Sequence, residues 1–325
     1  MEGQKKETGE GQPGTGMGQA KISWKSSLML FLAAFIWGTA FVAQSVGMDY
    51  LGPLSFNGAR FLMGSAVLLP VVWFKRAKKK REGGKPADIR TTMTGGICCG
   101  LLLCAASLLQ QYGILYTTVG KAGFITALYI ILVPFFGFFL KKKIAAKVWT
   151  GAVIAAFGMY LLCMSESLSL GRGDSLVFFC AILFSVHILV IDYFSPKVDG
   201  VELSCIQFLT AGVTAGVFAF LFEKPHIGDF VNGILPLAYA GILSCGVAYT
   251  LQVLGQKDTD PAIASLILSL ESTVSVLAGW IILDQALNGR ELTGCVLVFC
   301  AVILVQLPEK RAVSKSSKSL DRGRK

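Results

Sequence analysis

The chain alternates long apolar runs with short polar segments. Each run has about the 20 apolar residues that a helix needs to cross a bilayer core of about 30 Å. The ten runs cover residues 26–46, 54–74, 93–115, 120–140, 145–163, 174–194, 202–222, 232–254, 261–283 and 289–307. The runs are continuous and do not alternate between apolar and polar positions, so they exclude a membrane β-barrel. We therefore predict an all-α polytopic membrane protein with ten transmembrane helices.

The two halves of the chain resemble each other. "RFLMG" (60–64) is similar to "QFLTAG" (207–212), and "TGAVIAAFGMYLL" (150–162) is similar to "TGCVLVFCAVILV" (293–305). Each half holds five runs, so the second half must cross the membrane in the opposite direction to the first. Inverted repeats of this kind are typical of transporters, in which the repeats meet near the bilayer midplane around the substrate.

These patterns divide the chain into five segments. We predict a first repeat at 26–163 and a second at 174–307, joined by an external linker at 164–173. Residues 1–25 are polar and Gly-rich, which predicts a disordered cytoplasmic N-terminal tail. Residues 308–325 form a basic tail, also predicted to be cytoplasmic.

Composition and charge agree with this picture. The 325 residues are 54% hydrophobic and 15% charged, whereas soluble domains carry about 25% charged residues. The net charge of +10 reflects topology rather than nucleic-acid binding, because Lys and Arg concentrate at 75–90, at 141–147 and in the C-terminal tail, all on one predicted side. We expect a multi-pass protein of the inner or plasma membrane with both termini in the cytoplasm. The expected partners are a small-molecule substrate and the lipid bilayer, with no nucleic acid, and the sequence leaves a homodimer open.

Two charged residues lie more than five positions from either end of their apolar runs, and a charge at the centre of a span costs roughly 2.5–3.5 kcal/mol on insertion scales. Glu271 falls near the middle of the ninth run, within "LILSLESTVSVLAGW" (266–280). It could couple transport to protons, contact an ammonium group of the substrate or make a structural hydrogen bond. Arg60 lies near the external end of the second run and is expected to snorkel outward. An anion-binding or gating role for Arg60 is the alternative.

Further candidates follow from helical spacing. Aromatic and amide side chains suit a pocket that is mostly apolar with a few directed hydrogen bonds, and the alternative for each of them is packing. The candidates are Trp37, Gln44, Gln111, Tyr129, His187, Tyr249 and Gln252. His187 with Glu271 is the one plausible carboxylate–imidazole pair at depth. Pro134 should kink the fourth helix and free the carbonyl of Ile130.

Enzymatic motifs are weak. "GRGD" (171–174) matches a string found in intramembrane aspartyl proteases, but no second mid-helix Asp is present, so Asp174 is expected to cap a helix. Asp260 before Pro261 is expected to cap the ninth helix. The chain contains no HExxH, GxSxG or Walker A motif. We expect no catalytic residue, no metal site and no cofactor, and hence no enzyme.

Four segments resemble the EamA-type families of the drug/metabolite transporter superfamily. They are "FIWGTAFVAQSVGMDYLGPLSFNGARFLMG" (35–64), "LLQQYGILYTTVGKAGFITALYIILVP" (108–134), "GDSLVFFCAILFSVHILVIDYFSPKVD" (173–199) and "GVAYTLQVLGQKDTDPAIASLILSLES" (246–272). The resemblance implies two EamA repeats around a central cavity. Members of these families move amino acids, nucleosides or bases, other metabolites, or drugs. One departure is Ser272, which follows Leu270 and Glu271 where the family usually has proline.

The sequence thus favours a secondary active transporter of a small organic metabolite or drug-like solute. Alternating access is the expected mechanism, and export is the favoured direction. Proton coupling is one of the roles that Glu271 could have. A non-transporting membrane scaffold or sensor on the same fold is the alternative.

Overall fold

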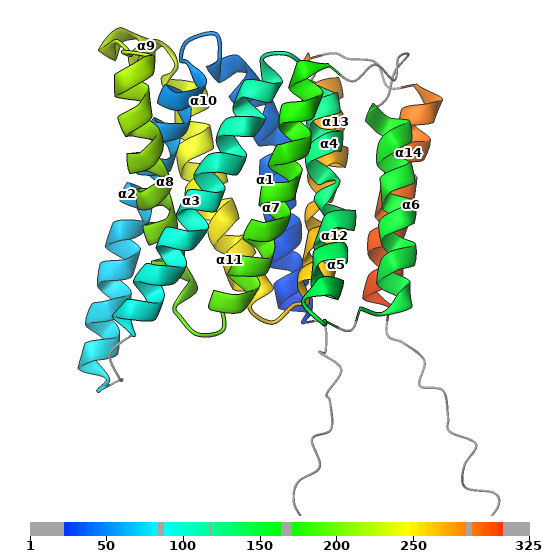
Figure 1. The fold of residues 1–325 in the computed structure, drawn as a ribbon, viewed down its shortest axis with the longest axis horizontal. Helices are drawn as coiled ribbons and strands as arrows, with labels where there is room; N and C mark the ends of the chain where they lie inside the picture. Colours follow the sequence, from blue (N-terminus) through cyan, green and yellow to red (C-terminus); the bar gives the residue numbers. More distant parts are fainter. Residues whose placement is uncertain are drawn as a thin grey trace, which may run out of the picture.

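The computed structural model describes residues 23–83, 88–117, 119–142, 144–163, 171–283 and 288–307. These residues form a bundle of long helices (Figure 1). Residues 1–22, residues 308–325 and most of the linker lie outside the described residues, and with them most of the tail predicted to be disordered. The helix α1 already begins at Trp24, inside the segment 1–25 for which the sequence predicts disorder.

The helices fall into two sets of five spans. The first set is α1 (Trp24–Gly47), α2 (Pro53–Arg81), α3 (Ile89–Ile114), α4 (Val119–Ala127) with α5 (Tyr129–Phe139), and α6 (Ala146–Cys163). The second set is α7 (Arg172–Phe194), α8 (Gly200–Phe222), the short α9 (Ile227–Asn232), α10 (Ile234–Ala238) with η1 (Tyr239–Tyr249) and α11 (Thr250–Gln256), α12 (Pro261–Leu268) with α13 (Leu270–Leu283), and α14 (Gly289–Gln306). The segment η1 is a π-helix, a form that is rare and often found at functional sites.

Among the described residues, nine helical stretches are long and apolar enough to cross a bilayer, and Ala146–Leu161 is a shorter apolar tenth. This confirms the prediction of ten transmembrane helices. Large apolar side chains such as Phe178, Phe220 and Ile303 are exposed on the outside of the bundle, where lipid would cover them. In Figure 1, α1 begins and α14 ends at the lower end of the bundle, which we call the terminal side.

Equivalent helices of the two repeats pack against each other. The helix α2 packs along α8 at the left of Figure 1, and α6 packs along α14 at the right. A Cβ atom on Gly158 of α6 would lie 2.9 Å from the carbonyl oxygen of Gly294, and one on Gly151 would lie 3.4 Å from that of Ala301. The similar segments "TGAVIAAFGMYLL" and "TGCVLVFCAVILV" match Gly151 to Gly294 and Gly158 to Ala301. The two contacts therefore exchange under the pseudo-two-fold operation that relates the repeats.

The fourth and ninth spans are each interrupted near their middle. The first is broken at Leu128, between α4 and α5, and the second at Ser269, between α12 and α13. Discontinuous helices near the midplane are typical of transporters built from inverted repeats. Pro134 lies inside α5 and is buried, so the interruption lies upstream of the proline, which differs from the predicted kink. The hydroxyl of Ser272 donates to the Gly123 carbonyl over 2.9 Å and ties the two broken spans together.

The seam between α2 and α8 is fastened at both ends. On the side opposite the terminal side, the Glu223 carboxylate accepts hydrogen bonds from the amides of Leu54 and Ser55, at 2.8 and 2.7 Å. These amides belong to the first turn of α2, where backbone N–H groups have no acceptor within the helix. Glu223 therefore acts as a cap for α2 supplied by the other repeat.

Two ion pairs close the same seam on the terminal side. Arg76 contacts Glu202 with two nitrogens, at 2.8 and 3.0 Å, and Lys75 contacts Asp199 at 2.6 Å. Burial alone would raise the pKa of Asp199. The hydrogen bond and charge of Lys75, with the first amides of α8, outweigh burial and hold that pKa below its ordinary value.

Aspartates cap helices as predicted. Asp260 accepts from the amide of Ala262 over 2.9 Å at the start of α12, with Pro261 in the first helical position. Asp174 accepts from the amide of Gly171 over 2.9 Å in the first turn of α7. Both capping predictions are confirmed, and the "GRGD" string is a helix start.

Candidate functional site

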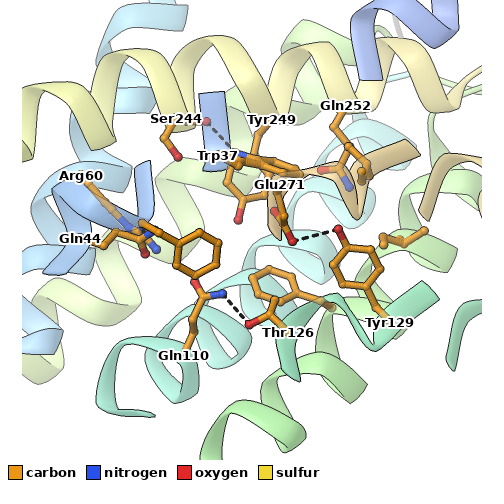
Figure 2. Close-up of a pocket in the computed structure, with 14 residues that line it drawn as sticks. Trp37, Gln44, Arg60, Gln110, Thr126, Tyr129, Ser244, Tyr249, Gln252 and Glu271 are labelled. Atoms are coloured by element: carbon orange, nitrogen blue, oxygen red, sulfur yellow. Dashed lines mark hydrogen bonds between the residues drawn. The ribbon is translucent and has the colours of Figure 1, made fainter. Parts of the chain in front are cut away.

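A cavity lies between the two repeats (Figure 2). Helices of both repeats contribute side chains, which come from α1, α2, α3, α4, α5, α7, η1, α11, α12 and α13. The lining residues are Trp37, Phe41, Gln44, Arg60, Gln110, Thr126, Tyr129, Phe184, Ile188, Ser244, Tyr249, Gln252, Leu268 and Glu271. Its mixture of aromatic walls with a few polar groups is typical of small-molecule sites.

Arg60 lines the cavity and is buried, with 2% of its surface exposed. This corrects the expectation that its side chain snorkels outward. The guanidinium is held in place by neutral oxygens, because Nε donates to Asn57 over 3.0 Å and Nη1 donates to Gln44 over 2.9 Å. The ring of Phe61 lies 4.8 Å from the guanidinium carbon and adds a cation–π contact.

An aromatic wall faces the centre of the cavity. The rings of Trp37 and Tyr249 lie 4.5 Å apart between centroids. The Trp37 indole N–H donates to the carbonyl of Ser244 over 3.3 Å, which fixes the ring against the π-helix η1. Figure 2 shows both rings beside Glu271. A flat apolar body could stack against this wall.

Glu271 and Tyr129 meet where the two interrupted helices face each other. The phenol of Tyr129 donates to the carboxylate of Glu271 over 2.9 Å (Figure 2). Tyr129 begins α5, and Glu271 lies in the first turn of α13, so each follows the break in its own span. The carboxylate is 5% exposed, and its second oxygen makes no hydrogen bond among the described residues. Glu271 is thus a carboxylate that borders the cavity with one oxygen engaged.

Two predicted cavity residues lie behind the lining. His187 is fully buried and shares a 3.2 Å hydrogen bond between Nε2 and the Gln207 side chain. Its ring meets that of Tyr249 edge-on at 6.4 Å, and Tyr249, not His187, is among the lining residues. Gln111 is also fully buried and donates to the Gln44 carbonyl over 3.1 Å. These contacts correct the prediction that both residues line the cavity, and they also leave His187 and Glu271 with different hydrogen-bond partners.

The other predicted residues stand at the cavity surface. Trp37, Gln44, Tyr129, Tyr249, Gln252 and Glu271 all line it. The side-chain oxygen of Gln252 is buried and has no hydrogen-bond partner among the described residues. An acceptor of this kind can take a hydrogen bond from a ligand or water. Contact with a substrate stays a prediction for all six residues.

The internal duplication explains most of the lining that the sequence reading missed. The interval from Arg60 to Gln207, in "RFLMG" and "QFLTAG", also separates Trp37 from Phe184 and Phe41 from Ile188. All four of these aromatic or apolar residues line the cavity. Phe41 lies one helical turn after Trp37 on the same face of α1. The repeat interval applied to Trp37 and Phe41 could therefore have predicted Phe184 and Ile188 in the second repeat.

A second interval relates the polar lining. The interval from Gln110 to Gln252 is one residue longer than that between the breaks at Leu128 and Ser269. It also separates Thr126 from Leu268 and Tyr129 from Glu271, so each of these pairs is within one position of equivalence, and all six residues line the cavity. The Gln110 amide donates to the Thr126 hydroxyl over 3.1 Å. The cavity is thus built from equivalent faces of the two repeats, with different side chains at several equivalent positions.

The site offers binding groups rather than a metal centre. Within the part of the chain that the structure describes, no group of three His, Cys, Asp or Glu side chains could hold a metal ion. The cavity instead presents one cation, one carboxylate, amides and aromatic rings. Such a set can orient a small solute that has both polar and apolar parts.

Comparison with known proteins places these features in a family. The family model described as "EamA-like transporter family" matches the chain twice, at residues 24–164 and 171–307. A protein of Archaeoglobus fulgidus, named an uncharacterized transporter, is 30% identical over 87% of this chain and 86% of its own length. A protein of Escherichia coli, named the uncharacterized inner membrane transporter YedA, is 22% identical over 86% of this chain and 89% of its own length. A solved crystal structure, 18% identical, covers 86% of this chain and 96% of its own chain with a TM-score of 0.69, which supports the fold.

Proposed function

Since the chain belongs to the EamA-like transporter family and is a multi-pass membrane protein, we propose that it is a secondary transporter of a small organic solute. It works by alternating access, in which the two inverted repeats rock against each other around the central cavity. The observation that carries this proposal is the cavity itself, because both repeats line it with equivalent faces.

Counterflow in proteoliposomes tests the proposal. The purified protein is reconstituted with an unlabelled metabolite inside the vesicles, and entry of the same labelled metabolite is measured across a broad panel. We expect at least one small organic solute to exchange faster than in protein-free vesicles. No exchange across the panel, together with stable binding of another protein, would instead favour a membrane scaffold or sensor.

The proposed direction is export, with protons as the coupling ion. Glu271 is the carboxylate that lines the cavity, and it lies near the middle of its span, where the two interrupted helices meet. A carboxylate in this place can exchange a proton with either side as the repeats rock. Intramembrane carboxylates commonly mark proton relays in transporters.

Both termini are proposed to face the cytoplasm. Lys and Arg gather on the terminal side, for example at the end of α2, which carries Lys78, Lys79, Lys80 and Arg81 in its last turn. The positive-inside rule assigns such a side to the cytoplasm. A fluorescent protein fused after residue 325 should fold and emit light, and a fused alkaline phosphatase should be inactive. The opposite pair of results would invert the orientation.

A further inference from the structure

The cavity holds a buried cation without a buried anion beside it. Arg60 makes no salt bridge among the described residues, and its two hydrogen bonds go to the neutral side chains of Asn57 and Gln44. Its Nη2 atom has no hydrogen-bond partner in the described part of the chain. Buried charges in proteins are usually paired, because removing one from water is expensive.

The fold does not require a charge at this position. Gln207 is the equivalent residue of the second repeat, and the phenylalanine that follows is present in both repeats. Phe61 and Phe208 stack at 6.2 Å with an interplanar angle of 8°. The second repeat therefore builds the same packing around a neutral amide, which bonds His187. Arg60 adds a permanent cation that the packing of these helices can do without.

The rest of the lining limits what the guanidinium can bind. Arg60 is the one Lys or Arg among the lining residues, and Glu271 is the one carboxylate. A second negative charge on the ligand would find no cation and would be repelled by Glu271. The aromatic wall of Trp37 and Tyr249 accepts a flat apolar body. The matching ligand is a monoanion with an apolar ring.

We propose that the solute is a monoanion and that Arg60 binds its carboxylate. The apolar ring of the solute would lie against Trp37 and Tyr249. That the ligand is a transported solute rests on the proposed function, but the binding site itself can be tested without transport. Asn57 and Gln44 hold the guanidinium so that Nη2 is left for the ligand. A carboxylate matches the planar geometry of a guanidinium, and the resulting charge-assisted hydrogen bonds are stronger than neutral ones.

Matched acids and amides test the proposal on the wild-type protein. Thermal stability of the purified protein is measured with phenylacetate, phenylacetamide, indole-3-acetate, indole-3-acetamide and phenyl phosphate, since a ligand that binds the native state raises its melting temperature. We expect each carboxylate to bind roughly 10- to 100-fold more tightly than its amide. Phenyl phosphate, with its second charge, should bind more weakly than the carboxylates. Equal binding of acid and amide, tighter binding of phenyl phosphate, or no stabilisation by any carboxylate would overturn the proposal.

Two variants separate ligand binding from a purely structural role. Arg60→Gln installs the residue that the second repeat uses, and it should bind acid and amide equally. Arg60→Lys keeps the charge and should restore part of the preference for the acid, which a packing role would not predict. If Arg60→Gln does not fold, the acid–amide comparison in the wild type and in Arg60→Lys still decides. A preference for acids retained in a folded Arg60→Gln protein would contradict the assignment.

Counterflow distinguishes the two proposals from each other. Carboxylates that bind through Arg60 but never exchange would leave the site in place and reject transport. Exchange of neutral or cationic solutes alone would support transport and reject the anion site.

Discussion

The hydrogen bond from Tyr129 to Glu271, 2.9 Å long, joins residues that lie within one position of equivalence in the two repeats, since Tyr129 begins α5 and Glu271 follows the first residue of α13. Equivalent or nearly equivalent residues that touch must lie close to the pseudo-two-fold axis that relates the repeats. The stacked pair Phe61 and Phe208 is a second such contact. Rocking that exchanges the conformations of the repeats leaves the axis in place. The Tyr129–Glu271 contact is therefore expected to persist in both the inward-facing and the outward-facing state.

Substitutions of this pair should separate coupling from movement. Glu271→Gln keeps a hydrogen-bond acceptor for Tyr129 but cannot carry a proton. We expect it to abolish solute movement driven by a pH gradient and to leave counterflow measurable. Tyr129→Phe removes the bond but keeps the carboxylate, so it should slow counterflow and retain gradient-driven movement. Both activities are measured in the same proteoliposomes, and unchanged gradient-driven movement in Glu271→Gln would reject the proton role.

The close contact of α6 with α14 predicts a sharp effect of a single methyl group. A Cβ atom on Gly158 would lie 2.9 Å from the Gly294 carbonyl oxygen, so Gly158→Ala must push the helices apart. We expect a loss of about 1–3 kcal/mol, seen as a lower melting temperature in detergent. Gly216→Ala is the matched control, because a Cβ atom there meets nothing within 4 Å. Equal stability of the two variants would show that the helices are not packed this closely.

Capping of α2 by the other repeat predicts a stability effect far from the cavity. Glu223→Ala removes the acceptor for the amides of Leu54 and Ser55 and should cost about 1–2 kcal/mol. Glu82→Ala is the control, since its pairing with Lys78 is exposed and long at 3.9 Å. Chemical or thermal unfolding measures both. A Glu223→Ala protein as stable as Glu82→Ala would argue against the cap.

Asp199 predicts a contribution to stability that depends on pH. Its pKa is lowered in the folded protein, so the stabilisation is present above the ordinary pKa of aspartate and is lost as pH falls through the lowered value. The side chain is 35% exposed, so screening limits the effect to less than about 1 kcal/mol. Asp199→Asn can still cap α8 but carries no charge. Melting temperatures from pH 7 to pH 3 should fall less steeply in this variant, and identical curves would contradict the prediction.

The helices could be predicted because the bilayer imposes long apolar runs, and the duplication could be read from short similar segments. The sequence did not predict the interruptions at Leu128 and Ser269. The run around Leu128 is continuously apolar, and the serines and Glu271 around Ser269 do not lower the hydropathy of that run enough to end it, so hydropathy does not mark either break. Ser272, where the resemblance implied proline, donates a hydrogen bond to Gly123 that a proline side chain could not make.

Side-chain direction was harder to predict than helix position. Arg60 lies near the end of its run, where a long cation can reach water, and only the placement of Gln44 on the neighbouring helix turns it inward. Gln111 and His187 have cavity-like chemistry, but their partners come from helices distant in sequence. Hydrogen bonds between spans decide these cases, and a single sequence does not record them.

The exchange of arginine for glutamine between equivalent positions has a consequence for how cargo travels. If the two inverted repeats had identical side chains, the cavity lining would look the same to a molecule arriving from either face of the membrane. The lining is not symmetric, because Arg60 has Gln207 as its equivalent in the second repeat. Arg60 lies in the first third of α2, which begins at the face away from the chain ends, so the cation is nearer that face. A solute with one charged end would then sit the same way round whichever side it entered from. It would cross head first in one direction and tail first in the other.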